Sequence, residues 1–333
     1  MELMTLAIIN NRQIISKVRH FQASIRINMH VNEECTMVQA TPTQEIDPKI
    51  YALYDEYCHG AMDRREFLAK AAAAVVGGMA MAQALFPRYA NAQTISFTDP
   101  RIKASYVKYA SPGGSSGEMR GYLVQPVSLS AKQFPAVLVI HENRGLNPYI
   151  EDVARRLAAA GFLALAPDGL HPLGGYPGND EDGKRLQDSL TPAKLQTDML
   201  NGAVFLKNHA LSSGKLGITG FCWGGGMTNA LAAELGNAVQ AGAPYYGLSA
   251  PADKVGQIKA ELVLHFAETD PRINTTWPAY EVALQAQGVK AQAHFYPGTQ
   301  HGFHNNSTPR FNQAAADSSW GRTLELFNRT LKT

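Results

Sequence analysis

The sequence carries little charge, and this shortage excludes some classes of partner. Only 17% of its 333 residues are charged, and the formal net charge is +2. No run of lysine and arginine stands out, so neither nucleic acid nor an anionic membrane is indicated as a partner. Apolar residues make up 45% of the chain, which is typical of a globular protein with a sizeable core.

Cysteine is also scarce, and its spacing argues against two kinds of site. It occurs at Cys35, Cys58 and Cys222, with no C-x-x-C pair, so a dithiol redox motif is not indicated. Histidines and carboxylates such as His141, Glu142 and His265 are scattered, without an H-E-x-x-H spacing. We therefore expect neither a metal nor a cofactor.

Residues 62–92 have the composition of an export signal. The pair Arg64–Arg65 precedes an Ala/Gly-rich apolar run from about 69 to 86, and the small residues Ala90 and Ala92 follow. This order is typical of a signal peptide, and the arginine pair is typical of the twin-arginine type, with which bacteria export folded proteins. A membrane-spanning helix is the alternative, but the run is short for that and only weakly hydrophobic.

The predicted signal divides the chain into three parts. Residues 1–61 form a leader extension, of which 1–36 need not be translated if Met37 is the true start. Residues 62–92 are the twin-arginine segment, and residues 93–333 remain as the mature domain. We expect the bacterial twin-arginine translocase as a partner during export and a periplasmic or secreted location, and leave open whether the leader is cleaved or stays as a membrane anchor.

Strand and helix patterns alternate along residues 93–333. Alternating or continuously apolar stretches predict strands at 103–111, 118–126, 134–141, 162–168, 215–221, 239–247, 260–268 and 291–298. Helical patterns occupy 147–161, 191–209, 224–236, 274–288 and about 310–331. Residues 171–190, rich in Gly, Pro, Asp and His, are expected to form an exposed loop. The alternation predicts an α/β fold with a mostly parallel central sheet and helices on both faces.

Cys222 lies in the stretch "GFCWGGG" (220–226), at the predicted junction of a strand and a helix. Gly220 and Gly224 flank it, giving G-x-C-x-G where α/β hydrolases place the serine of G-x-S-x-G. So tight a turn needs glycines, because neighbouring Cβ atoms would clash. The helix N-terminus lowers a thiol pKa and offers N–H groups to an oxyanion. The alternative is a small buried cysteine at a glycine hinge.

Asp270 and His301 follow Cys222 in the order that α/β hydrolases use, nucleophile, acid and then histidine. Asp270 comes after one predicted strand and His301 after the last, and open α/β sheets build their sites at such strand ends. In a triad His301 is the base and Asp270 holds its tautomer. Asp270 as a helix N-cap is an alternative, and His304 is the nearest rival of His301.

The stretches "GFCWGGG", "ETD" and "YPGTQHGFHN", together with residues 139–170, resemble the dienelactone hydrolase (carboxymethylenebutenolidase-like) family over roughly 100–330. The resemblance implies an α/β-hydrolase fold and cysteine-dependent hydrolysis of esters or lactones through a covalent acyl-enzyme. It implies the triad Cys222, Asp270 and His301.

The resemblance also assigns auxiliary roles beside the nucleophile. It implies that Glu142 contacts the thiol and helps to deprotonate it, and that the backbone N–H groups of Asn143 and Trp223 form an oxyanion hole. Glu142 as a capping carboxylate for the helix at 148–160 is the alternative.

One departure from the family bears on the substrate. Its dienelactone-specific members bind a substrate carboxylate through arginines, one of them shortly after the catalytic histidine, whereas here "HGFHNN" is followed by arginine only at Arg310. Arg144 is another candidate to contact an acidic group. We therefore expect a small-molecule ester or lactone in general as the substrate. A thiol-based redox or binding protein on the same scaffold is the alternative function.

Overall fold

The computed structural model describes residues 47–58, 62, 64–84, 93–128 and 131–332. Residues 1–36, the alternative start at Met37 and the predicted cleavage site at Ala90 and Ala92 lie outside these residues. The described residues therefore cover nearly all of the expected hydrolase domain and part of the leader.

The leader region contains three helices, α2 (Pro48–Cys58), α3 (Arg64–Ala74) and α4 (Gly78–Ala84). The apolar run expected from 69 to 86 is divided between α3 and α4 at Gly77, whose φ of +77° suits glycine. In the part of the chain that the structure describes, no helix has both the length and the apolar character needed to cross a membrane. The twin-arginine assignment of Arg64 and Arg65 stays a prediction.

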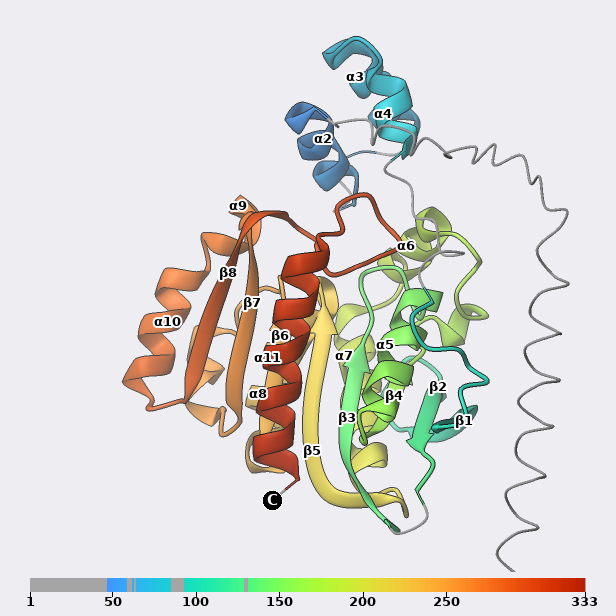
Figure 1. Cartoon of the computed structure of the whole chain (residues 1–333), viewed down its shortest axis with the longest axis vertical. Coiled ribbons are helices and arrows are strands. Elements are labelled where there is room, and N and C mark those ends of the chain that lie inside the picture. Colours follow the sequence, from blue (N-terminus) through green and yellow to red (C-terminus); the bar gives the residue numbers. More distant parts are fainter. Residues whose placement is uncertain (1–46, 59–61, 63, 85–92, 129–130, 333) are drawn as a thin grey trace, which may run out of the picture. The chain divides into compact units, whose positions relative to one another are not determined.

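The described part of the hydrolase domain is built around one eight-stranded sheet, whose strands lie in the order β1-β2-β4-β3-β5-β6-β7-β8 (Figure 1). The strands are β1 (Ile102–Ser111), β2 (Gly117–Pro126), β3 (Phe134–Ile140), β4 (Leu163–Pro167), β5 (Ser212–Phe221), β6 (Ala241–Tyr245), β7 (Glu261–Thr269) and β8 (Ala291–Gln300). Strand β2 is antiparallel to both of its neighbours, and all other pairs are parallel. The predicted α/β fold with a mostly parallel sheet is confirmed.

Helices cover both faces of this sheet. The long ones are α5 (Pro148–Ala159), α7 (Pro192–Lys207), α8 (Trp223–Leu235), α10 (Trp277–Ala286) and α11 (Gln313–Leu331). Apolar residues of α5 and α11 share one core cluster, whereas those of α7, α8 and α10 share the other.

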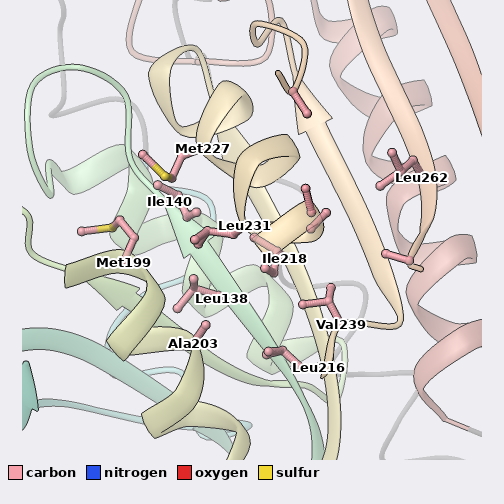
Figure 2. Close-up of a cluster of buried hydrophobic side chains, with 14 of the residues drawn as sticks. Leu138, Ile140, Met199, Ala203, Leu216, Ile218, Met227, Leu231, Val239 and Leu262 are labelled. Carbon is pink, nitrogen blue, oxygen red and sulfur yellow. The ribbon is translucent and has the colours of Figure 1, made fainter. Parts of the chain in front are cut away.

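The central strand β3 belongs to both clusters, because successive side chains of a strand point to opposite faces. Val137 and Val139 lie in the α5/α11 cluster. Leu138 and Ile140 lie in the other, where Figure 2 shows them beside Met199 of α7 and Leu231 of α8. A strand buried on both faces explains the continuous apolar run from which β3 was predicted.

The expectation of an exposed loop at 171–190 is wrong, because this segment contains a 3₁₀ turn (His171–Leu173) and the helix α6 (Asp180–Asp188). Asn179 caps α6, its Oδ1 accepting a hydrogen bond from the amide of Asp182 at 2.8 Å. Helix α6 packs so tightly on the loop after β3 that a Cβ at Gly183 would lie 2.4 Å from the carbonyl oxygen of Arg144. A short polar helix of this kind has no apolar stripe to reveal it in the sequence.

Candidate active site

Cys222 lies on a strained turn between β5 and α8. Its φ of 57° and ψ of −115° fall in a region that L residues rarely adopt, at a cost of about 1–3 kcal/mol. A Cβ on Gly220 would lie 2.2 Å from the carbonyl oxygen of Gly224, and a Cβ on Gly224 would lie 2.4 Å from that of Ile140. The predicted need for glycine on both sides of the cysteine is confirmed.

His301 and Asp270 meet at the carboxyl ends of the neighbouring strands β8 and β7. His301 Nδ1 donates to Asp270 Oδ2 over 2.6 Å, and both side chains are buried. The other carboxylate oxygen of Asp270 accepts a hydrogen bond from the amide of Ile273 at 3.4 Å, which caps the short helix α9 (Pro271–Asn274). Both interpretations of Asp270, as a helix cap and as a partner of the histidine, therefore hold.

The Cys222 thiol and the His301 ring interact, and each changes the pKa of the other. Burial by itself would raise the pKa of Cys222, but His301 and Arg272 together outweigh burial and the pKa is lowered. Burial would lower the pKa of His301, but the charges of Cys222 and Asp270 outweigh it and the pKa is raised. These opposite shifts favour a thiolate beside an imidazolium.

His304 is engaged elsewhere. Its Nδ1 forms a 2.6 Å hydrogen bond with the hydroxyl of Tyr149, and its ring packs 5.3 Å from that of Phe221. Burial holds the pKa of His304 well below the ordinary value. His301 is therefore the histidine that joins the thiol to a carboxylate. The ring of Tyr246, whose own φ is 36°, packs 4.9 Å from the ring of His301.

Glu142 is buried just beyond the end of β3, and its Oε2 accepts a hydrogen bond from Asn305 Nδ2 at 3.0 Å. The alternative role of Glu142 as the cap of the next helix is wrong, because Asn147 caps α5 through the amide of Ile150. The charge of Glu142 raises the pKa of Cys222 and so opposes ionisation of the thiol, which differs from the deprotonating role that the family resemblance implies. Sequence reasoning missed Asn305, although it stands in the "HGFHNN" stretch where the absence of an arginine had been noted.

A cavity of about 500 Å³ opens beside Cys222. Asn143 and Trp223, whose N–H groups are the predicted oxyanion donors, line it as well. Most of the remaining lining is apolar, contributed by Leu190, Pro192, Leu195, Met227, Ala230, Leu248 and Ile273. The site is therefore a largely apolar pocket with a thiol at its wall.

Two arginines near the site have different positions. Arg144, the candidate for an acidic group, forms a buried 2.7 Å ion pair with Asp180 of α6. Arg272, which the sequence analysis did not single out, lines the cavity, and its charge favours the Cys222 thiolate. Its position two residues after Asp270 is the feature that could have identified it. Among the residues that the structure describes, no group of three or more His, Cys, Asp or Glu side chains is placed to hold a metal ion.

A mostly parallel sheet with helices on both faces and a strained, glycine-flanked turn after β5 defines the class of α/β hydrolases. The sequence model of the Dienelactone hydrolase family matches residues 119–331. The chain belongs to this family. A second model, described as YqhI-like, matches residues 38–75 in the leader region.

Individual relatives agree with this assignment. The chain is 60% identical over 114 residues to a hydrolase fragment named YghX of Escherichia coli. The matched residues make up 34% of this chain and 96% of the fragment. It is 31% identical to a Synechocystis protein named as a carboxymethylenebutenolidase, over 65% of this chain and 93% of the relative.

A solved structure is also similar. It is described as a dienelactone hydrolase from Klebsiella pneumoniae and gives a TM-score of 0.58 at 26% identity, covering 68% of this chain and 99% of that one. Together with the family match, these similarities make the chain a hydrolase that acts on lactones or esters.

Proposed function

We propose that the chain hydrolyses small esters or lactones through a covalent acyl-enzyme on Cys222, with His301 and Asp270 as its partners. The observation that carries this proposal is the continuous chain of contacts from Asp270 through His301 to a thiol on a strained turn at the wall of a cavity. A merely structural cysteine would not need a buried histidine–carboxylate pair.

In the first half of the reaction the Cys222 thiolate attacks the carbonyl carbon of the substrate. Backbone N–H groups of Asn143 and Trp223, both on the cavity wall, stabilise the oxyanion that forms. When this intermediate collapses, the bond from the carbonyl carbon to the alkoxy oxygen breaks, and His301 Nε2 gives its proton to the departing oxygen. The product of this half is a thioester on Cys222.

In the second half a water molecule attacks the thioester while His301 Nε2 takes the proton of that water. The thiolate then leaves, the carboxylic acid is released, and one water has been consumed. Asp270 keeps Nδ1 of His301 protonated throughout, which leaves Nε2 to exchange protons, and it stabilises the imidazolium.

Hydrolysis of p-nitrophenyl acetate, with and without iodoacetamide and EDTA, separates this proposal from its rivals. We expect iodoacetamide to abolish hydrolysis and EDTA to leave it unchanged. Hydrolysis that survives complete alkylation of Cys222 would leave the thiol with a structural or redox role, and hydrolysis lost in EDTA would point to a metal.

We also propose that the protein is exported in folded form by the twin-arginine translocase. The support is the order of Arg64–Arg65, the apolar run and the small residues in the sequence. Export as a folded protein suits a domain whose site is assembled from strands far apart in the chain.

A further inference from the structure

His141 is a buried residue directly after β3, at the start of the loop that reaches the cavity. Both of its ring nitrogens form hydrogen bonds with backbone groups. Nε2 lies 3.2 Å from the amide nitrogen of Gly169, in the loop after β4, and Nδ1 lies 2.6 Å from the carbonyl oxygen of Glu142. The ring is therefore held between two loops that leave neighbouring strands.

These two contacts determine which ring nitrogen carries hydrogen. The backbone N–H of Gly169 can only donate, so Nε2 of His141 is an acceptor without hydrogen. Burial lowers the pKa of His141, which favours the neutral ring. In a neutral imidazole whose Nε2 accepts, the hydrogen is on Nδ1, and Nδ1–H therefore donates to the carbonyl oxygen of Glu142.

The carbonyl of Glu142 and the N–H of Asn143 belong to the same peptide group. Because this group is planar and trans, the two bonds point in opposite directions. A donor that holds the carbonyl on one side therefore fixes the direction of the N–H on the other side. Asn143 lines the cavity together with Cys222, and its N–H is one of the two proposed oxyanion donors.

His141 also contacts the residue that bears the other proposed donor. Its ring stacks on that of Trp223 at the start of α8, with centroids 5.4 Å apart and planes inclined by 20°. The backbones are close as well, since a Cβ on Gly224 would lie 2.5 Å from the carbonyl oxygen of His141. One side chain thus touches both of the segments whose amides must point to the same oxygen atom.

We propose that His141 is a positioning residue that orients the Asn143 amide of the oxyanion hole through the carbonyl of Glu142. The oxyanion forms only as the carbonyl carbon is attacked, so the effect falls on acylation and not on the reactivity of the thiol itself. This inference rests on the proposed function, because the oxyanion arises during acyl transfer to Cys222.

Asparagine and glutamine at position 141 separate the two hydrogen bonds. The amide nitrogen of asparagine can take the place of Nδ1 and donate to Glu142, whereas the amide oxygen of glutamine can take the place of Nε2 and accept from Gly169. We expect His141→Gln to lower kcat/KM for p-nitrophenyl acetate, which reports acylation, by about ten- to a hundredfold, because outright loss of one oxyanion donor costs roughly 10²–10³. His141→Asn should recover most of this loss.

Alkylation of Cys222 by iodoacetamide in the same full-length variants is the readout that separates orientation of the amide from general damage to the site. The thiolate displaces iodide from a saturated carbon, so no oxyanion forms. The alkylation rate as a function of pH, followed by mass spectrometry of the Cys222 peptide, should keep both its plateau and its midpoint in His141→Gln.

His265→Gln is the matched control. His265 is also buried and is also hydrogen-bonded through both ring nitrogens, to the hydroxyls of Tyr296 and Thr323. This variant should lose stability in thermal unfolding but keep its kcat/KM. If His141→Gln does not fold, Gly169→Ala takes its place, because the added Cβ would lie 2.5 Å from Nε2 of His141 and displaces the ring. It should lower kcat/KM and leave alkylation unchanged.

An unchanged kcat/KM in folded His141→Gln, or in Gly169→Ala where that variant replaces it, would overturn the inference. So would equal losses in the asparagine and glutamine variants, because the hydrogen bond to Glu142 would then not be the one that matters. A fall in the alkylation rate as large as the fall in kcat/KM would also overturn it. Failure of the proposed function would be seen differently, as undiminished hydrolysis in Cys222→Ala.

Discussion

Gly224→Ala tests how closely the turn that carries Cys222 packs against the end of β3. The added Cβ would lie 2.4 Å from the carbonyl oxygen of Ile140 and 2.5 Å from that of His141. Both oxygens belong to backbone at the end of β3, which is held between β4 and β5, so neither can move alone.

Overpacking usually costs about 1–3 kcal/mol, and because backbone rather than a flexible side chain is in the way, we expect about 3 kcal/mol. For a domain of this size that loss lowers the melting temperature by roughly 6–12 °C. Activity should fall as well, by about tenfold or more, because the start of α8 is pushed away from Asn143 and the two proposed oxyanion donors, the amides of Asn143 and Trp223, are separated.

Thermal unfolding of the full chain, monitored by circular dichroism, and kcat/KM for p-nitrophenyl acetate measure the two effects. Gly321→Ala is the matched control, because it lies inside α11 and no atom is within 4 Å of its added Cβ. It should be stabilised by up to about 1 kcal/mol through helix propensity and keep full activity. A Gly224→Ala variant as stable and as active as the unmodified protein would refute the close-packing argument.

Three further predictions address the histidine, the leader and the domain boundary. His301→Ala should move the Cys222 alkylation midpoint upward, since the pKa of the thiol is lowered by His301 and rises towards its ordinary value of about 8.5 or above without it; a midpoint that does not move would remove His301 from the pair. Replacing Arg64 and Arg65 by lysine should retain the precursor in the cytoplasm, and undiminished periplasmic protein in cell fractionation would contradict the export proposal. A chain beginning at residue 93 should unfold cooperatively. A chain beginning at residue 97 should have a free energy of unfolding lower by roughly 1–3 kcal/mol in urea denaturation, because the amides of Thr94 and Ile95 both donate to the buried Asp152 at 2.8 Å. Equal stability of the two chains would contradict that reasoning.

The central strands of the hydrolase domain could be predicted because a strand that is buried on both faces appears in the sequence as a continuous apolar run. The run at 134–141 is continuously apolar, and β3 occupies Phe134–Ile140. Helix α6 could not be predicted in the same way, since it is nine residues long, polar and held by its Asn179 cap and by contacts with the loop after β3. Short polar helices depend on such tertiary contacts more than on periodicity.

The residues of the candidate site also differ in whether the sequence alone could indicate them. Cys222, Asp270 and His301 could be proposed from the sequence because each follows a predicted strand and their order along the chain is characteristic of the fold. Asn305 and Arg272 were missed because their interest comes only from what they face, a carboxylate 163 residues away and the cavity beside the thiol. No local sequence pattern indicates a contact between residues so far apart in the chain.

The turnover number of Cys222→Ala tests the central claim most directly. Alanine fits the space of cysteine and leaves the turn and the His301–Asp270 pair in place, so the variant should keep its melting temperature within a few degrees. Without the nucleophile, kcat for p-nitrophenyl acetate should fall by roughly 10⁴-fold or more. A folded Cys222→Ala protein that hydrolyses the ester at near the unmodified rate would contradict the account.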